Sequence, residues 1–303
     1  MTERGRVGPD DGPAVLNRQA RAALRALLRP GAYVGAALEG LHTLVHAAVY
    51  PLGMHSVETV QRSLGAHRAV LAVDERSDAA VTRIPVILVH GYVFNRSAFF
   101  IMSQALEKAG FEHVRAFNYP QFSHRLERVA GLLAAEVERA LAATGAAKCM
   151  IVGHSMGGVV ARYYVQALGG QETTDTVVTI GTPHAGSYTA HLGIGPAAVQ
   201  MTYRSSFLER LRSEARPSAV RYISYYSDLD GWVLPADSAK LTDPALQATN
   251  IRVRDVGHLS MLLSAPVIHS VVQYLSHPER DRPRPVDGDT AQSLEQRSGN
   301  DPT

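Results

Sequence analysis

The chain has 303 residues, of which 46% are hydrophobic, and its formal net charge at pH 7 is +2. A chain of this length and apolar content can bury one large core, or one core with an accessory segment. The small net charge gives no support to a nucleic-acid partner, and the single cysteine, Cys149, excludes an internal disulfide framework. Because Cys149 lies in an apolar run, we expect a small buried hydrophobic residue rather than a reactive thiol.

Residues 1–83 are expected to form a helical extension. Residues 1–12 have the composition of a disordered start, and residues 14–29 predict an amphipathic helix with an arginine face and an apolar face. Such a helix either packs its apolar face on the rest of the protein, which we favour, or lies on an anionic membrane surface. The sequence therefore leaves open a peripheral membrane contact through the N-terminal helices.

The stretch from Tyr33 to Tyr50 predicts a second helix. Glu39, His42 and His46 repeat along it as a polar stripe, which argues against a transmembrane span. No clean cleavage site follows, so a signal peptide is not expected, and a signal anchor is the less favoured alternative. We expect one or two more helices in 51–83, and we favour a cytoplasmic or membrane-peripheral location.

From Ile84 onward, short apolar runs alternate with helical segments. The expected strands are 84–89, 112–119, 148–152, 176–180, 221–227 and 250–256, and the expected helices are 98–108, 124–143, 156–168 and 266–274. This alternation implies right-handed crossovers and an α/β fold, with a doubly wound, mostly parallel sheet of about six strands. We assign the catalytic domain to 84–277, and the polar composition of 278–303 predicts a disordered tail.

Residues 185–219 interrupt the alternation of strands and helices. Their apolar side chains, Leu192, Ile194 and Met201 among them, predict a small cap segment that forms an apolar wall over the strand ends. The alternative is a helix that covers the sheet edge without any role in selectivity. Phe94, which follows the first expected strand, is expected to extend the same apolar groove.

The most informative stretch of the chain runs from Lys148 to Tyr164. An apolar strand is followed by Gly153-His154-Ser155-Met156-Gly157-Gly158 and then by a segment of helical character. A strand, a tight turn of small residues and a helix form the context that a G-x-S-x-G nucleophile elbow requires. Gly153 and Gly157 are expected to provide the clearance that the strained turn needs, so Ser155 is the candidate nucleophile.

A serine nucleophile needs a base, and the base needs a carboxylate that fixes its tautomer. In open α/β sheets such groups collect at the carboxyl ends of the strands. His258 follows the last expected strand directly and is the candidate base. Asp228, Asp230 and Asp237 are the candidate acids, and we favour Asp230 because Gly231 lets the backbone turn sharply after it.

Five segments in this order, VILVHGY, GHSMGG, GTPHAG, YYSDLDGWV and DVGHL, resemble the α/β-hydrolase superfamily. Within it, the pattern is similar to the compact bacterial triacylglycerol lipases and esterases, over about Ile84 to His277. The resemblance matches Ser155 to the nucleophile, Asp230 to the acid and His258 to the base. It also implies an oxyanion hole formed by the backbone amides of Tyr92 and Met156.

The resemblance implies a hydrolase that cleaves carboxylic esters, of lipids or of small alcohols, through an acyl-enzyme and without a cofactor or metal. Two features depart from the smallest family members: the N-terminal extension of about 80 residues and the lack of an apparent signal peptide. Two alternatives stay open, namely an acyltransferase that uses the same triad and, less favoured, a non-catalytic binding protein on this fold.

Overall fold

The computed structural model describes residues 29–54, 83–120 and 122–277. Several of the expectations above lie outside these residues: the start at 1–12, the helix over 14–29 except for Arg29, the helices expected in 55–82, and the tail at 278–303.

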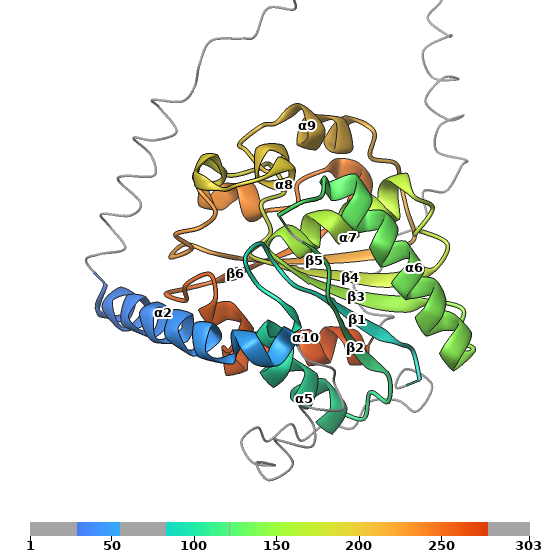
Figure 1. Ribbon diagram of the computed structural model, residues 1–303, viewed down its shortest axis with the longest axis horizontal. Coiled ribbons are helices and arrows are strands. Elements are labelled where there is room, and N and C mark those ends of the chain that lie inside the picture. Colours follow the sequence, from blue (N-terminus) through green and yellow to red (C-terminus); the bar gives the residue numbers. More distant parts are fainter. Residues whose placement is uncertain (1–28, 55–82, 121, 278–303) are drawn as a thin grey trace, which may run out of the picture.

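A parallel sheet forms the centre of the molecule (Figure 1). Its strands are β1 Val86–Val89, β2 Val114–Phe117, β3 Cys149–His154, β4 Thr174–Ile180, β5 Arg221–Ser227 and β6 Thr249–Val253. Their order in the sheet is β2-β1-β3-β4-β5-β6, and every neighbouring pair is parallel. The predicted doubly wound sheet of about six strands is therefore confirmed.

The strand order places a topological switch point between β1 and β3. The chain moves outward from β1 to β2, returns to the other side of β1 as β3, and then proceeds to β6. Val89 pairs in register with Gly153, so the loops after β1 and β3 leave the sheet at the same level and diverge. A crevice at the carboxyl ends of strands, at such a point, is where open α/β sheets bind their ligands.

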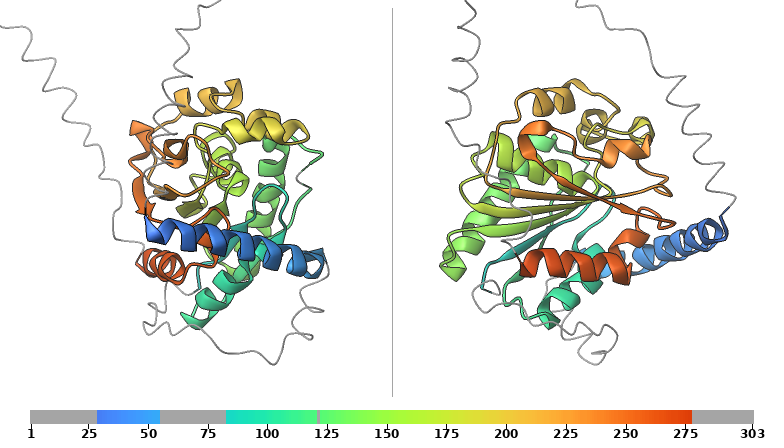
Figure 2. Two further views of the ribbon diagram at one scale, coloured as in Figure 1. Left: turned by 90° about the vertical axis from the view of Figure 1, so that its left-hand side faces the viewer. Right: turned by 180° about the vertical axis from the view of Figure 1, so that it is seen from behind.

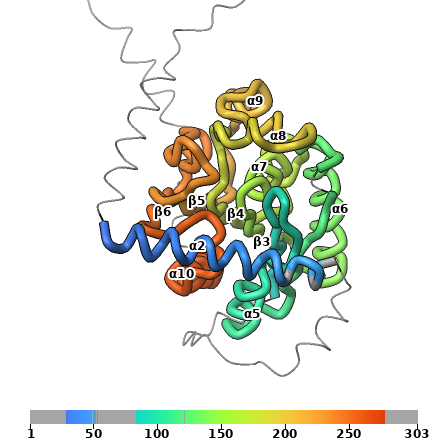
Figure 3. The backbone as a smooth tube through the Cα atoms, turned by 60° about the vertical axis from the view of Figure 1, so that its left-hand side comes forward, coloured from blue at the N-terminus to red at the C-terminus, as the bar shows by residue number. Residues whose placement is uncertain are grey.

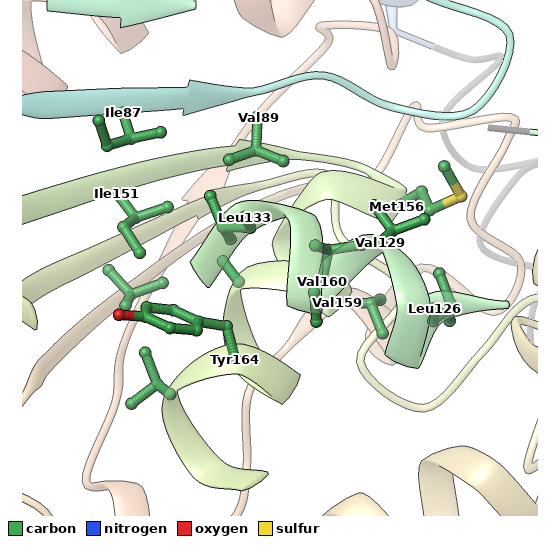
Figure 4. Packing of buried hydrophobic residues seen from close by; sticks show 14 of the residues in the cluster. Ile87, Val89, Leu126, Val129, Leu133, Ile151, Met156, Val159, Val160 and Tyr164 are labelled. Carbon is green, nitrogen blue, oxygen red and sulfur yellow. The ribbon is translucent and has the colours of Figure 1, made fainter. Parts of the chain in front are cut away.

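Two helical layers cover the sheet. Helices α6 Leu126–Thr144 and α7 Met156–Ala167 pack on one face, whereas α5 Phe100–Lys108 and α10 Ala265–Ser276 pack on the other (Figure 1). Alternate residues of β1 divide between the layers, since Ile87 faces α6 and α7 while Leu88 faces α5 and α10. Figure 4 shows the interlocking of β1, β3, α6 and α7 in the first layer.

Most element boundaries lie within one to three residues of the expected ones. The largest difference is at β6, which ends at Val253 and not at 256, while β3 continues past its expected end to His154 and so reaches the residue before Ser155. The helix expected from 98 begins as the 3₁₀ helix η2 Arg96–Phe99, whose Ser97 amide is capped by the side chain of Asn95. Cys149 is buried, as expected, and burial raises the pKa of its thiol to about 12.

The segment that was expected to form a cap lies over the sheet's α7 side (Figure 1). It contains η3 Tyr188–Leu192, α8 Pro196–Gln200 and α9 Ser206–Ser213. Buried Gln200 anchors it, because its side chain accepts a hydrogen bond from the Leu126 amide at 2.7 Å and donates one to Glu127 at 2.8 Å. Short 3₁₀ helices complete the fold: η4 Ala236–Ala239, η5 Pro244–Leu246 and η6 Ser260–Leu262.

Helix α2 Pro30–Val49 and the following η1 Tyr50–Met54 form a strap across the carboxyl ends of the strands (Figures 2 and 3). Arg29, directly before α2, pairs with Asp228 and Asp255 in the loops after β5 and β6. At the other end, Asn118 after β2 donates a hydrogen bond to the Gly53 carbonyl. Among the described helices, none is long and apolar enough to cross a membrane.

Candidate active site

The turn between β3 and α7 has the geometry expected of a nucleophile elbow. Ser155 lies between the last residue of β3 and the first of α7, with φ 53° and ψ −123°, a backbone conformation that residues other than glycine rarely adopt. A Cβ atom at Gly157 would lie 2.1 Å from the Val89 carbonyl oxygen, and one at Gly153 would lie 2.6 Å from Gly158. Only glycine therefore fits at the two positions that the sequence singled out.

The strained turn is held by its neighbours on both sides. The Ser155 amide donates a hydrogen bond to the Ile180 carbonyl at the end of β4, at 2.8 Å, and its carbonyl accepts one from Gly158 at 3.0 Å. On the β1 side, the backbone of Gly91 approaches so closely that a Cβ there would lie 2.9 Å from the Ser155 Cβ. The Ser155 side chain, which is partly exposed, thus lies at the switch point of the sheet.

Asp230 and His258 form a buried pair. The His258 Nδ1 lies 2.7 Å from Asp230 Oδ2, and both side chains are almost fully shielded from solvent. The other oxygen, Oδ1, accepts the amides of Trp232 at 2.8 Å and Val233 at 2.9 Å. With its acceptors occupied in this way, the carboxylate can hold a proton on His258 Nδ1 and leave Nε2 free to accept one.

His258 lies close to the elbow. Its ring is tilted against that of His154 at a centroid distance of 4.6 Å, and the Trp232 ring lies 6.1 Å away on a nearly parallel plane. A Cβ atom at Gly181, directly after the residue that binds the Ser155 amide, would lie 3.0 Å from His258 Nδ1. The Ser155 hydroxyl and the His258 ring are not hydrogen-bonded to each other; such catalytic hydrogen bonds are often long without substrate and tighten when it binds.

The amides expected to form an oxyanion hole belong to Met156 and Tyr92. Met156 is the first residue of α7, where an amide has no helical acceptor. Within the described chain, neither amide donates a hydrogen bond to another protein group. Val93, next to Tyr92, has φ 59°, which is a strained value for a β-branched residue, so both amides are flanked by strained backbone.

Three histidines around the elbow are neutral. Burial lowers the pKa of His90 to about 4 and lowers the pKa values of His154 and His184 well below 6.5. His154 Nε2 lies 3.3 Å from the His258 carbonyl, and His90 stacks on Tyr119. These side chains are therefore hydrogen-bonding parts of the scaffold.

The three candidate acids have different partners, and only one of them contacts His258. Asp230 faces His258, whereas Asp228 is paired with Arg29 at 2.8 Å and Arg252 at 2.9 Å. Burial acts to raise the pKa of Asp228, but the hydrogen bonds from Arg29, the Asp255 amide and Arg252 outweigh it and lower that pKa. Asp237, in η4, is exposed and paired with Lys240.

The residues expected to bind substrate occupy two kinds of environment. Leu192 and Ile194 are 87% and 76% exposed, and the Tyr92 hydroxyl bonds to the Ile194 backbone, which fixes the cap next to the loop after β1. Met201, by contrast, is buried in the core cluster around α6 and α7, and Phe94 is partly buried between the rings of His46 and His154. Their contact with substrate stays a prediction.

Sequence reasoning did not identify two residues that shape the site. Trp232 flanks His258, although its segment had been singled out for its aspartates. Glu39 of α2 accepts hydrogen bonds from the amides of Leu259 and Ser260, immediately after His258. The polar stripe that contains Glu39 was a signal, but nothing in the sequence indicates which loop it contacts. Among the described residues, no cluster of histidine, cysteine or acidic side chains is arranged to hold a metal ion.

Comparison with known proteins places these features in a family. The family model described as "Alpha/beta hydrolase family" matches residues 86–300. A triacylglycerol lipase of Burkholderia plantarii is 36% identical over 132 residues, which are 41% of this chain and 36% of the relative. A triacylglycerol lipase of Pseudarthrobacter phenanthrenivorans is 37% identical over 115 residues, 36% of this chain and 35% of the relative. The chain thus spans only about a third of the length of these relatives.

Solved structures show the same fold. Bacillus licheniformis lipase BlEst2 in its mature form has a TM-score of 0.53 and 19% identity, over 65% of this chain and 94% of that one. Aspergillus fumigatus lipase B has a TM-score of 0.58 and 20% identity, over 73% and 59% of the two chains. At these identities the likeness concerns the fold alone.

Proposed function

The chain belongs to the alpha/beta hydrolase family, and we propose that it is a serine hydrolase that cleaves carboxylic esters of lipids through an acyl-enzyme. The observation that carries the proposal is the buried Asp230–His258 pair, which lies beside a serine held in a strained elbow at the switch point of the sheet. Among serine hydrolases, this combination of nucleophile, base and oriented carboxylate is recognised by its geometry and not by sequence position.

In the proposed acylation step, the Ser155 Oγ attacks the ester carbonyl carbon while His258 Nε2 takes the hydroxyl proton. Asp230, bonded to His258 Nδ1 at 2.7 Å, stabilises the imidazolium that forms. Collapse of the tetrahedral intermediate breaks the bond to the alcohol oxygen, and the imidazolium gives its proton to that leaving group. The products are a free alcohol and an acyl group esterified to Ser155.

The amides of Met156 and Tyr92 are proposed to bind the oxyanion of this intermediate. Neither amide has an acceptor among the described residues, and Met156 begins a helix of 12 residues whose N-terminal dipole favours negative charge. Removal of one oxyanion donor costs about 3 kcal/mol of transition-state stabilisation in comparable enzymes. In deacylation, His258 takes a proton from a water molecule, which attacks the acyl carbonyl carbon. The imidazolium then gives this proton to the Ser155 Oγ as the bond to the acyl group breaks and the carboxylic acid leaves.

A direct test replaces the proposed nucleophile. Ser155→Ala should abolish hydrolysis of p-nitrophenyl esters while the unfolding midpoint changes little, because the side chain lost is small and partly exposed. The exposed Ser213→Ala at the end of α9 is the matched control and should hydrolyse at the wild-type rate. Wild-type activity in Ser155→Ala would overturn the proposal.

Lipid esters are the proposed substrates for two reasons. Exposed apolar side chains surround the site, including Leu192 and Ile194 of the cap and Trp232 beside His258, and both relatives described above are triacylglycerol lipases. A panel of p-nitrophenyl esters from C2 to C16, together with emulsified triacylglycerol, tests this. Activity on short soluble esters alone would limit the function to an esterase, and acyl transfer to an added alcohol in place of release would identify an acyltransferase.

A peripheral contact with the lipid surface through α2 is part of this proposal. Six large apolar residues of α2 are exposed, with Leu44 at 69% and Leu41 at 54%: Tyr33, Val34, Leu38, Leu41, Leu44 and Val45. The helix crosses the carboxyl ends of the strands (Figure 3), which is the edge where Ser155 lies between β3 and α7, so a lipid surface in contact with α2 would lie at the same edge as the site.

The contact is tested by sedimentation with phosphatidylcholine–triacylglycerol particles. A Leu41→Asp/Leu44→Asp variant should bind them more weakly than the wild type and keep its activity on p-nitrophenyl butyrate. Leu168→Asp, at an exposed site after α7, is the control. Binding of the particles by the α2 variant as strong as that of the wild type would contradict a lipid contact.

A further inference from the structure

Helix α2 lies against the two loops that carry Asp230 and His258. A Cβ atom at Gly35 would lie 2.2 Å from the Asp255 carbonyl oxygen and 2.7 Å from the Leu229 side chain, so the helix backbone contacts both loops directly. Before the helix, Arg29 bridges the loops through Asp228 at 2.8 Å and Asp255 at 3.0 Å. The beginning of the strap therefore contacts the two loops that carry the proposed acid and the proposed base.

One turn further along α2, the Glu39 carboxylate reaches the backbone after His258. Its Oε1 accepts the Leu259 amide at 2.8 Å, and its Oε2 accepts the Ser260 amide at 2.9 Å and the Ser260 hydroxyl at 2.7 Å. His42, on the same side of the helix, lies 2.8 Å from the Ser260 hydroxyl. Three donors from two consecutive residues thus converge on one carboxylate, 220 residues away in the sequence.

The backbone of His258 is consequently fixed from both sides. Its carbonyl lies 3.3 Å from His154 Nε2, which belongs to the strand before Ser155. The two amides that follow it are held by Glu39, and these amides start the short helix η6. Because a carboxylate with amide partners makes charge-assisted hydrogen bonds, this attachment is stronger than one by a neutral acceptor.

We propose that Glu39 is a positioning residue for His258, so that the α2 strap is part of the catalytic machinery and not an accessory to it. The inference rests on the proposed role of His258 as the base, and it goes beyond that role because it assigns a function to a helix outside the matched residues 86–300. Release of the carboxylate would let the 257–260 loop shift. A displacement of about 1 Å from a change remote from the chemistry can cost on the order of 100-fold in rate.

Glu39→Gln is the decisive variant because it keeps the size of the side chain and places an amide NH₂ against backbone donors. On p-nitrophenyl butyrate we expect kcat to fall about 10- to 100-fold, with KM changed by less than about threefold, since the substrate contacts are intact. Glu138→Gln on α6 makes the same chemical change at an exposed position and should leave both constants unchanged. A wild-type kcat in Glu39→Gln overturns the inference.

A second variant reaches the same contact from the loop. A Cβ atom at Gly257 would lie 2.3 Å from Glu39 Oε2, so Gly257→Ala should displace the carboxylate without changing α2 itself. We expect the same fall in kcat and a loss of hydrogen-exchange protection at the amides of Leu259 and Ser260. Should Glu39→Gln fail to fold, this variant decides: wild-type kcat together with lost protection would overturn the positioning role.

The rate at which a fluorophosphonate modifies Ser155 separates this inference from the proposed function. That reaction depends on His258 as base but not on the turnover of any ester. If the wild type hydrolyses no ester and Glu39→Gln is still phosphonylated at least about 10-fold more slowly than Glu138→Gln, the proposed ester substrates are wrong and the positioning role stands. Equal phosphonylation rates would overturn the positioning role.

Discussion

Helices α6 and α2 have 19 and 20 residues, yet they turn opposite faces toward the protein. On α6 the apolar stripe is inside, with Leu126, Val129 and Leu133 fully buried against the sheet (Figure 4). On α2 the polar stripe is inside, where Glu39 and His42 bond to the loop after His258, while the large apolar residues are exposed.

The difference follows from what lies beneath each helix. Below α6 is the face of a parallel sheet, whose backbone groups are already paired and whose side chains are apolar. Below α2 are the carboxyl ends of the strands, where the loops carry amides that do not bond within the sheet, such as those of Leu259 and Ser260, which donate to Glu39. A polar helix face is therefore the complementary one at this edge.

The largest effect that would sharpen this comparison is on stability. Leu133→Ala on α6 should lower the free energy of unfolding by about 3 kcal/mol, because it leaves a cavity in the core. The same substitution on the outer face of α2, Leu41→Ala, should change it by less than about 0.5 kcal/mol. Urea denaturation of both variants measures this, and a similar loss for Leu41→Ala would mean that the outer face of α2 is covered.

The comparison also explains which parts of the site were predictable. The apolar strands, the α6 stripe and the glycines around Ser155 were readable because each depends on local pattern or local sterics. Asp230 was separable from Asp228 only through the turn at Gly231, and the structure gives the reason for the difference: Asp228 is occupied by Arg29 and Arg252.

The contact made by Glu39 was not predictable. The periodicity of Glu39, His42 and His46 identifies a polar face but not its partner, because 220 positions separate Glu39 from Leu259. A polar helical stripe ordinarily faces water, and only the arrangement of the strand ends reverses that expectation here. Long-range backbone capping of this kind leaves no local pattern in the sequence.

A second prediction concerns His90, which, unlike Glu39, is fully buried. His90 has a pKa of about 4 in the folded protein because of burial, against about 6.5 in an unfolded chain. Between these two values the unfolded chain binds a proton at His90 and the folded protein does not. The free energy of unfolding is therefore highest above pH 6.5 and falls as the pH is lowered toward 4. His90 alone should lower the unfolding free energy by about 2 kcal/mol between pH 7 and pH 5.

The measurement is the urea midpoint at pH 7 and pH 5 for the wild type and two variants. His90→Phe keeps a ring against Tyr119 but cannot ionise, so its midpoint should change less with pH than that of the wild type. His191→Gln, at an exposed position, should follow the wild type. Parallel curves for the wild type and His90→Phe would show that His90 is not the group that titrates.

The smallest effect is expected where the strap ends. Asn95 Nδ2 donates to the Tyr50 carbonyl at 2.7 Å, while its Oδ1 caps η2 through the Ser97 amide at 3.0 Å. Asn95→Asp keeps the cap and loses the donor to the strap, whereas Asn95→Ala loses both, so we expect losses of about 1 and about 2 kcal/mol in unfolding free energy. If Asn95→Asp is as stable as the wild type, the Tyr50 contact contributes nothing to stability, and the strap is held at this end by the contact of Asn118 with Gly53. A loss of about 1 kcal/mol in Asn95→Asp relative to the wild type means that the strap is fastened on both sides of the switch point, by Arg29 and Glu39 on one side and by the Tyr50 contact on the other.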